Sequence, residues 1–420
     1  MARNTPGWLR NAVIYEIYVP GHSELGTFEG VTADLERIKD LGGDIIWLMP
    51  IHPIGIEGRK GSLGSPYAIK DYRAINPLLG DAASLGELIA KTHQLGMKVI
   101  IDVVFNHTAK DSVLVKEHPE WFLRDQGGNF TRKVADWSDI YDLDYSQEGL
   151  WDYLIAALQG WLAMGIDGFR CDVAALTPIE FWKKARSVLG RDREVIWLAE
   201  SVHKGFIKYL RDRGFTAHSD PELHQAFDLT YDYDGFEYLE DYFHGRGELK
   251  EYLKYLYLQE TLYPKEAIKL RFLENHDQER IGALIPDRQI LKNWVVFYSL
   301  LPGATLVWAG QAIMLKKRID FFERELIDWE RDDVEFYNFF KNALHVAKEI
   351  KGKCDRFMIE ELKPGVVKIT WQGQGEEFGA VLNLDWRNGA AAADCDIHGE
   401  ELMGTGIRRI RYCRIILKNT

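Results

Sequence analysis

Three carboxylates in three short motifs carry the chemistry that this sequence suggests. The motifs are GFRCDVA (168–174) with Asp172, VIWLAES (195–201) with Glu200 and FLENHDQER (272–280) with Asp277. Each carboxylate follows a short apolar or β-prone run, at the point where a loop should begin. The strands of a parallel α/β barrel bring such ends together around one mouth. Carboxyl groups there could protonate a leaving oxygen, attack a carbon and stabilise a developing cation, which cleavage of a glycosidic bond requires.

Apolar strands that alternate with amphipathic helices predict the elements that would position these groups. The expected strands cover residues 12–19, 44–50, 97–107, 166–173, 194–200, 224–231, 267–277 and 303–311. They are apolar almost throughout, as expected when both faces of a parallel sheet are buried. Eight strands interleaved with helices predict an α/β fold, a closed (β/α)8 TIM barrel rather than an open doubly wound sheet.

The domain organisation follows from two changes in this pattern. The barrel should span residues 1–352, interrupted after its third strand by a short polar and aromatic insertion at 108–147. A connection this long within a compact domain is usually functional, so we expect a small subdomain over the barrel mouth. Beyond the barrel, β-prone runs separated by Gly, Pro and Asn predict a C-terminal antiparallel β-domain over 353–420. These runs are 356–362, 365–373, 377–385 and 411–418.

Composition and charge limit the partners of this chain. Of its 420 residues, 46% are hydrophobic and 28% are charged, which is typical of a soluble protein with a substantial core. The net charge of −12 and the pI of about 5.6 argue against a nucleic-acid partner, because phosphates favour basic proteins. No run of about 18 apolar residues predicts a membrane helix. The N-terminal residues lack the apolar stretch of a signal peptide, so a cytoplasmic location is expected.

The four cysteines, Cys171, Cys354, Cys395 and Cys413, form no CxxC pair, which disfavours a zinc or redox site. Cys171 adjoins Asp172, so a nucleophilic thiol is conceivable. A small residue packed behind the barrel strand is the better interpretation, since free cysteines are among the most buried residues.

The motifs resemble, in order, those of the alpha-amylase superfamily of glycoside hydrolases. DVVFNH (102–107) resembles its third-strand motif, GFRCD (168–172) its nucleophile motif, Glu200 its acid/base position and ENHD (274–277) its last motif. The resemblance covers nearly the whole chain and suggests a maltogenic or maltooligosaccharide-acting member. It implies retaining hydrolysis of α-1,4-glucosidic bonds in starch-type glucans and maltooligosaccharides, with these sugars as the expected partners.

The resemblance also implies a role for each carboxylate. Asp172 would be the nucleophile, Glu200 the general acid and then the base, and Asp277 the stabiliser of the transition state. Glu200 needs a raised pKa to be protonated near neutrality, whereas Asp172 needs to stay ionised. Arg170, two residues earlier, shares a strand face with Asp172 and should keep it charged.

Further residues match substrate-binding positions of the family. His107 and His276 would bind hydroxyls of the sugar being cleaved, Tyr67 would stack on its ring, and Asp320 with Arg324 would clamp it. A flat ring complements the apolar face of a pyranose. The clamp match is looser, because the local sequence DFFER is unusual. Asp102 is assigned to support of the site.

The sequence departs from the family at positions that bear on calcium and on the cleft. Ala175 and Leu176 replace a Lys and a His of many starch-degrading relatives, and the His would lend its carbonyl to calcium. Asn106 could be a calcium ligand, but no acidic partner stands out in the insertion. Calcium prefers six to eight oxygen ligands, so we expect no obligatory metal or other cofactor. Ala312 replaces the Glu of a Gly-Gln-Glu motif, which hints at a cleft that releases maltose.

Other functions stay open. A 4-α-glucanotransferase would use the same glycosyl–enzyme intermediate, for which water and a sugar hydroxyl compete. A sucrose- or trehalose-directed glucosidase is a weaker alternative. A non-enzymatic binding scaffold is disfavoured, because it predicts erosion of carboxylates that are all present. The sequence does not indicate an oligomeric state.

Overall fold

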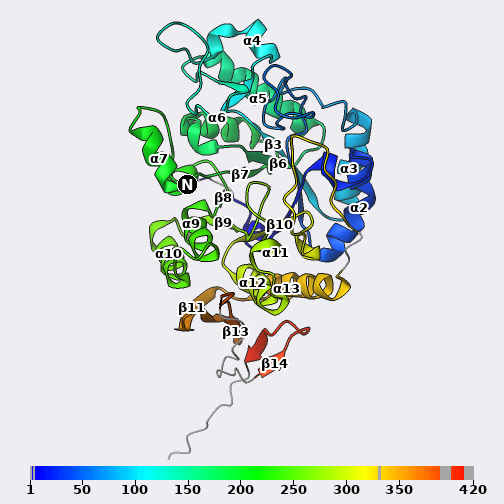
Figure 1. The fold of residues 1–420 in the computed structure, drawn as a ribbon, viewed down its shortest axis with the longest axis vertical. Coiled ribbons are helices and arrows are strands. Elements are labelled where there is room, and N and C mark those ends of the chain that lie inside the picture. Colours follow the sequence, from blue (N-terminus) through cyan, green and yellow to red (C-terminus); the bar gives the residue numbers. More distant parts are fainter. Residues whose placement is uncertain (1, 3–4, 330–332, 388–398, 411–420) are drawn as a thin grey trace, which may run out of the picture.

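Eight parallel strands close into a barrel at the centre of the molecule (Figure 1), in the order β1-β10-β9-β8-β7-β6-β3-β2. The computed structural model describes residues 2, 5–329, 333–387 and 399–410. The barrel strands are β1 (Val13–Ile17), β2 (Ile45–Leu48), β3 (Lys98–Val103), β6 (Gly168–Cys171), β7 (Ile196–Ala199), β8 (Leu229–Tyr231), β9 (Ile268–Arg271) and β10 (Ala304–Trp308). The predicted (β/α)8 barrel is confirmed.

The strands form because almost every residue in them is buried, with the barrel interior on one face and helices on the other. The main helices around them are α2 (Phe28–Leu41), α3 (Ala82–Gln94), α5 (Glu148–Ala163), α6 (Ile179–Leu189), α7 (Lys204–Arg211), α9 (Tyr233–Phe243), α10 (Leu249–Leu262), α12 (Arg288–Leu300) and α13 (Val334–Lys353). Local signals set their ends. Asp81 and Ser84 form a capping box at the start of α3, and Gly42, with φ of 113°, ends α2.

The predicted strand at 224–231 is wrong over its first five residues. Only Leu229–Tyr231 pairs as β8, and the short helix α8 (Asp220–Leu223) precedes it. The backbone N–H groups of Ala226 and Phe227 donate to the carbonyl of Leu223, so this segment continues the turns of α8. An apolar and polar mixture of this length does not distinguish a helical turn from a strand.

The insertion after β3 contains β4 (His107–Ala109), α4 (Val113–Glu117), a 3-10 turn (Pro119–Trp121) and β5 (Ile140–Asp142). The strands β4 and β5 pair in antiparallel fashion, so His107 stands opposite Asp142. In Figure 1, α4 lies at the end of the molecule away from the C-terminal sheet. The insertion therefore rises from the same side of the barrel as the strand ends that carry the candidate carboxylates.

The C-terminal sheet is antiparallel in the order β11-β12-β13-β15-β14, which confirms the predicted β-domain. Its strands are β11 (Arg356–Lys363), β12 (Val366–Gly373), β13 (Glu376–Asn383), β14 (Gly399–Glu401) and β15 (Arg408–Ile410). The predicted run at 411–418 lies outside the described residues. The sheet packs on α12, where Trp371 Nε1 donates to the carbonyl of Leu300 at 2.9 Å.

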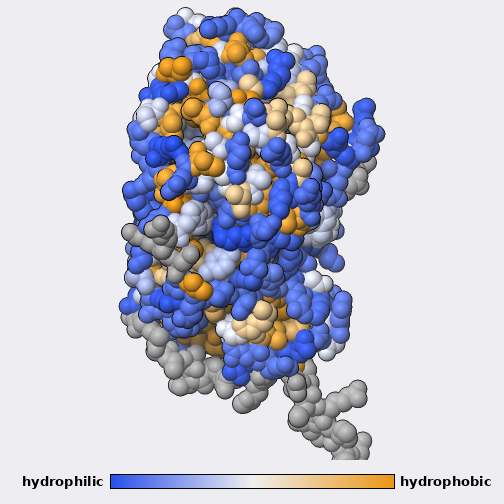
Figure 2. All heavy atoms as spheres, turned by 90° about the vertical axis from the view of Figure 1, so that its right-hand side faces the viewer, coloured by the Kyte–Doolittle hydropathy of each residue, from blue (hydrophilic) through white to orange (hydrophobic). Residues whose placement is uncertain are grey.

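The surface is hydrophilic over most of the face in Figure 2, with apolar side chains in small separate groups. Among the described residues, no helix combines the length and the apolar character needed to cross a membrane. The cytoplasmic location stays a prediction of the sequence.

Candidate active site

Arg170 lies at the centre of the carboxylates at the mouth of the barrel. Its Nη1 donates to both oxygens of Asp102, each at 2.9 Å, and to Oδ1 of Asp172 at 3.0 Å. Its Nη2 lies 2.8 Å from Oε1 of Glu200. Because Arg170 and Asp172 are two residues apart, they share a strand face, as predicted. One buried guanidinium therefore joins carboxylates from the ends of β3, β6 and β7.

The loop that follows Asp172 is built around an unusual backbone conformation. Val173 has φ of 34° and ψ of 45°, in the left-handed region that a β-branched residue rarely adopts. In this conformation its backbone N–H donates to Oε2 of Glu200 at 2.6 Å. Strain of this kind is held by the surrounding structure and is typical of functional sites. No sequence signal distinguished Val173 from its neighbours.

Burial sets the protonation of the central pair of carboxyls. Asp172 and Glu200 are only 7% and 6% exposed. Burial raises the pKa of Glu200 to about 7, with Arg170 opposing and Asp172 adding to the shift, as a general acid requires.

The expectation that Arg170 keeps Asp172 ionised needs correction. Burial raises the pKa of Asp172 to about 7, because it outweighs the opposing charge of Arg170. The carboxylate of Asp102 adds to the shift, and it shares the same guanidinium. Near neutral pH, Asp172 and Glu200 can therefore hold one proton between them.

His276 links a buried carboxylate to an exposed one. Its Nδ1 lies 2.5 Å from Oε1 of Glu16, and its Nε2 lies 3.2 Å from Oδ2 of Asp277 and 2.7 Å from the hydroxyl of Tyr67. Burial lowers the pKa of His276, but the charges of Asp277 and Glu16 outweigh it and raise this pKa to about 9. His276 is therefore a cation at neutral pH. The ring of Tyr67 stacks on it with 5.5 Å between centroids.

Glu16 is a residue of this site that the sequence reasoning missed. It is fully buried in β1 and bonds to His276 across the barrel. A signal was present, because Glu16 is the single charged residue in the otherwise apolar run 12–19. Asp102, assigned to support, does hold Arg170 and also accepts from the Tyr67 hydroxyl at 3.2 Å.

Comparison with known proteins identifies the family of this chain. Residues 14–343 match the family model of the alpha amylase catalytic domain. The chain belongs to the alpha-amylase family of glycoside hydrolases. It is similar to the solved structure of an alpha-amylase from Lactobacillus plantarum, with 44% identity, coverage of 90% of this chain and 89% of that one, and a TM-score of 0.86. The noncanonic maltogenic alpha-amylase AmyB from Thermotoga neapolitana has 38% identity, coverage of 90% and 86%, and a TM-score of 0.81.

Curated relatives of this alpha-amylase family member include both alpha-amylases and maltosyltransferases by name. Alpha-1,4-glucan:maltose-1-phosphate maltosyltransferase from Arcanobacterium haemolyticum is 31% identical over 55% of this chain and 33% of its own length. Alpha-amylase 2 from Dictyoglomus thermophilum is 25% identical over 82% of this chain and 64% of its own length. The chain thus spans between one third and just under two thirds of these relatives.

His107 and Asp277, two further candidates for sugar binding, differ in their exposure to solvent. His107 is buried, its ring lies 5.4 Å from that of Trp137, and burial lowers its pKa to about 4. It is therefore neutral and can both donate and accept a hydrogen bond. Asp277 has a side chain that is 46% exposed, which leaves its carboxylate open at the mouth.

Asp320 and Arg324, the predicted sugar-clamping pair, each contact backbone groups of the protein. Asp320 Oδ1 accepts from the backbone N–H of Phe322 at 2.8 Å, and the guanidinium of Arg324 donates to the carbonyl of Glu24. Both residues are exposed and shape the loop after β10. Phe321 in this loop lies edge-on to His276, with 6.1 Å between ring centroids.

Cys171 packs behind the strand, as expected. It is fully buried and free, and burial raises the pKa of its thiol. A thiolate nucleophile is therefore disfavoured, since reactive cysteines have lowered pKa values and some exposure.

Asn106, the possible calcium ligand, contacts a buried lysine. Lys133 Nζ lies 2.5 Å from Oδ1 of Asn106 and 3.5 Å from Oδ2 of Asp142. The side chains of Lys133 and Asp142 are 8% and 0% exposed, so a buried ammonium fills the position between these oxygens. Across the described parts of the chain, no cluster of three or more His, Cys, Asp or Glu side chains is suited to a metal ion.

Proposed function

We propose that this protein hydrolyses α-1,4-glucosidic bonds in starch-type glucans and maltooligosaccharides, with retention of configuration and release of maltose and other short products. The observation that carries the proposal is the contact of Arg170 with both Asp172 and Glu200 in one buried site. The similarity to alpha-amylases, one of them maltogenic by name, supports the same substrate class.

The proposed reaction has two steps. Asp172 attacks the anomeric carbon while Glu200 gives its proton to the leaving oxygen, so the glycosidic bond breaks and a glycosyl ester forms. Glu200 then takes a proton from water, which attacks the same carbon and releases Asp172. A retaining enzyme needs these carboxyls adjacent. Their contacts at 3.0 and 2.8 Å with the two terminal nitrogens of Arg170 support that arrangement.

The surrounding residues would bind the sugar and the developing positive charge. The carboxylate of Asp277 is exposed at the mouth and is paired with the His276 cation. This pairing would hold the carboxylate in one orientation, in which it can accept hydrogen bonds from sugar hydroxyls. Tyr67 would offer its ring, and neutral His107 would bind a further hydroxyl. These roles rest on position and on the family resemblance.

Two features support short products. Ala175 and Leu176 are 0% and 2% exposed, so neither side chain can contact a sugar beyond the cleavage point. Ala312 is likewise buried. A cleft with few side-chain contacts on its acceptor side would bind long chains weakly there.

We also propose that activity needs no calcium. The ammonium of Lys133 already supplies positive charge to Asn106 and Asp142, at the joint between β3 and the insertion. A divalent cation would have to displace a buried lysine and would still find few of the six to eight oxygen ligands that calcium prefers.

The test is chromatography of the products formed from maltoheptaose, with Asp172→Ala and the exposed-site control Lys208→Gln alongside. Maltose and other short products from the native protein and from Lys208→Gln, but not from Asp172→Ala, are expected. Products longer than maltoheptaose would move the assignment to glucosyl transfer, a reaction type that the maltosyltransferase relatives make a specific alternative. No turnover of maltoheptaose would contradict the proposal and direct attention to sucrose and trehalose.

A further inference from the structure

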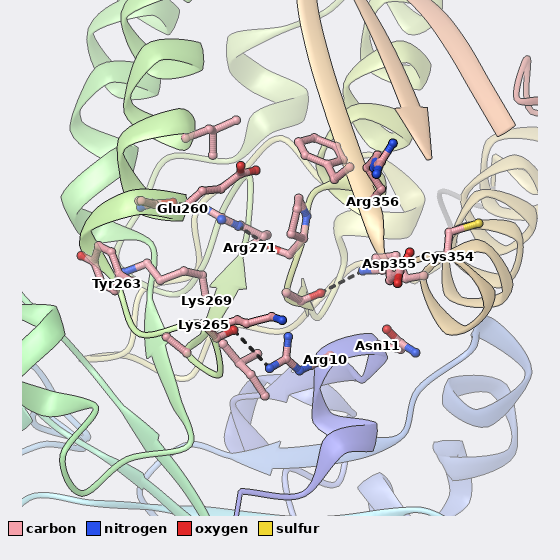
Figure 3. A pocket seen from close by; sticks show the side chains of 18 of the residues that line it. Arg10, Asn11, Glu260, Tyr263, Lys265, Lys269, Arg271, Cys354, Asp355 and Arg356 are labelled. Atoms are coloured by element: carbon pink, nitrogen blue, oxygen red, sulfur yellow. Dashed lines mark hydrogen bonds between the residues drawn. The ribbon is translucent and has the colours of Figure 1, made fainter. Parts of the chain in front are cut away.

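A cavity of about 740 Å³ lies at the end of the barrel opposite the candidate active site. It is open to solvent and is lined by the N-terminal ends of β9 and β10, by α10, and by β11 and β12 of the C-terminal sheet. Basic side chains dominate its charged lining: Arg10, Lys265, Lys269, Arg271, Lys351 and Arg356. In Figure 3, Arg10 and Lys265 lie on one side of the cavity and Arg356 on the other. The volume is within the range of small-molecule sites, about 300–1,000 Å³.

Two of these cations are neutralised from behind. Lys269 Nζ lies 2.8 Å from Oδ1 of Asp234, and Arg271 Nη1 lies 2.7 Å from Oδ2 of Asp232. Both are buried ion pairs, so the positive charge of each is balanced by a carboxylate within the protein. The other four basic residues of the lining therefore determine the electrostatic potential of the cavity.

The other four cations have little compensation. Within the described part of the chain, no ion pair engages Arg10, Lys265 or Arg356, and Arg10 donates only to the carbonyl of Lys265 at 3.3 Å. The cavity lining contains two carboxylates, Glu260 and Asp355. A local excess of positive charge is contrary to the net charge of −12 of the chain. Such an excess in a concave site favours an anionic ligand.

Lys351 provides an independent indication of an anion. Lys351 is 9% exposed, and its Nζ donates to the carbonyl of Gly303 at 2.9 Å and to Oγ1 of Thr305 at 3.2 Å. Both partners are neutral, and an ammonium has a third proton to donate. A buried ammonium without a carboxylate partner is costly, so such a lysine tends to lose its proton unless a bound anion pairs with it.

The charges around Lys351 strengthen this point. Burial lowers the pKa of Lys351, the cations of Arg271 and Lys348 add to this shift and Asp44 opposes it, so that the resulting pKa is about 7. Asp44 is itself paired with Lys348. An anion bound in the cavity would therefore raise the affinity of Lys351 for its proton.

The uncharged part of the lining indicates what carries the anionic group. Phe357 stands at the cavity with its ring 5.2 Å from that of Trp371. An aromatic face complements the apolar side of a sugar ring, and a carboxylate such as Glu260 accepts from sugar hydroxyls. Guanidinium and ammonium groups bind phosphate. We propose that this cavity is a binding site for a phosphorylated sugar, whose phosphate contacts Lys351 and whose other oxygens lie within reach of Arg10 on one side and Arg356 on the other.

The site would join two parts of the chain. Arg356 and Phe357 belong to β11, whereas Arg10 precedes β1 and Lys351 lies in the last turn of α13. A ligand that contacts all of them would hold the C-terminal sheet on the barrel. Binding should therefore raise the melting temperature.

The test is isothermal titration of the full chain at pH 7.5 with glucose 6-phosphate, inorganic phosphate and glucose. Glucose 6-phosphate should bind once per chain, with Kd below about 1 mM, and more tightly than either other probe. The double variant Arg10→Gln/Arg356→Gln removes two exposed cations without disturbing the core and should weaken binding by about tenfold or more. Lys208→Gln, which removes an exposed cation of α7, and Asp172→Ala should bind as the native protein does.

Proton uptake gives a second readout. Titrations in two buffers of different ionisation enthalpy should detect protons taken up on binding, and Lys351→Met should abolish that uptake. If this buried variant does not fold, the double variant still decides the outcome. Absence of binding, unchanged affinity in the double variant, or equal affinity for inorganic phosphate would overturn the proposal. Because Asp172→Ala is included, failure here is distinct from failure of the proposed hydrolysis.

Discussion

Nδ1 of His276 lies 2.5 Å from Oε1 of Glu16, so a carboxylate at the start of the chain bonds to a histidine 260 residues later. The opposite ring nitrogen faces Asp277 at 3.2 Å. Glu16 is 0% exposed and cannot contact a substrate directly. It positions His276 and keeps it charged, and His276 in turn orients the exposed carboxylate of Asp277.

Glu16→Gln should shift the alkaline limb of activity. The carboxylate of Glu16 helps to raise the pKa of His276 to about 9, so its neutral replacement lowers that pKa. If charged His276 orients Asp277 in the working enzyme, kcat/KM on maltoheptaose should begin to fall at a lower pH, by about one unit or more. Glu279→Gln, an exposed change three residues from His276, is the matched control. Identical pH profiles for Glu16→Gln and the native protein would contradict this role.

The same pair should make stability depend on pH. The pKa of His276 is raised in the folded state from 6.5 to about 9, so the protonated histidine favours folding. That contribution is complete below about pH 6.5 and is lost as the pH rises through 9. Between these values the melting temperature of the native protein should fall more than that of Glu16→Gln. An equal change of melting temperature with pH in the two proteins would show that the pair of Glu16 and His276 contributes nothing to the pH dependence of stability.

Asp172→Asn should abolish activity and also alter the pH dependence of stability. Loss of a nucleophile should lower kcat by about 10⁴-fold or more. The folded-state pKa of Asp172 is raised from 3.8 to about 7, so its ionisation costs stability as the pH rises through this window. The melting temperature of Asp172→Asn relative to the native protein should therefore rise between pH 4 and 7. A constant difference across that range would contradict the raised pKa.

Glu200→Gln should affect substrates according to their need for a proton. With maltoheptaose the loss should be about 10²–10⁴-fold, because the leaving sugar must be protonated. With α-maltosyl fluoride, whose leaving group needs no proton, the first turnover should be nearly retained. Rapid-quench measurement of fluoride release separates the two steps. Equal losses on both substrates would exclude Glu200 as the general acid.

Lys133→Met should destabilise the protein, and chelation should not. The change leaves the carboxylate of Asp142, which is 0% exposed, without its cation. Breaking a buried pair from one side costs about 3–5 kcal/mol, so a large drop in melting temperature is expected. Lys116→Met removes an exposed lysine of the same insertion and is the control. A calcium-dependent rise in the melting temperature of the native protein, or lost activity in EDTA, would contradict the proposed role of Lys133.

The sequence by itself determined the barrel. Each strand is buried on both faces, so it consists of a short and mostly apolar run that can be recognised in the sequence. It also placed Asp172, Glu200 and His276 at the mouth, since residues that follow parallel strands in a closed barrel meet at one end. The two-residue spacing of Arg170 and Asp172 predicted their contact, because alternate residues of a strand share a face. These inferences need only local periodicity and the order of the motifs.

Only the tertiary structure decided how the charges are shared. Arg170 contacts three carboxylates from three strands, so its charge is shared among them. Burial, and not the nearby charge of Arg170, has the largest effect on the pKa of Asp172. The bond of Lys133 to Asn106 and the separate contacts of Asp320 and Arg324 are likewise invisible in local sequence. Spacing along a strand or helix reports which residues share a face. Burial and pairing between distant segments are set when the chain closes the barrel, and these decide the protonation of the site.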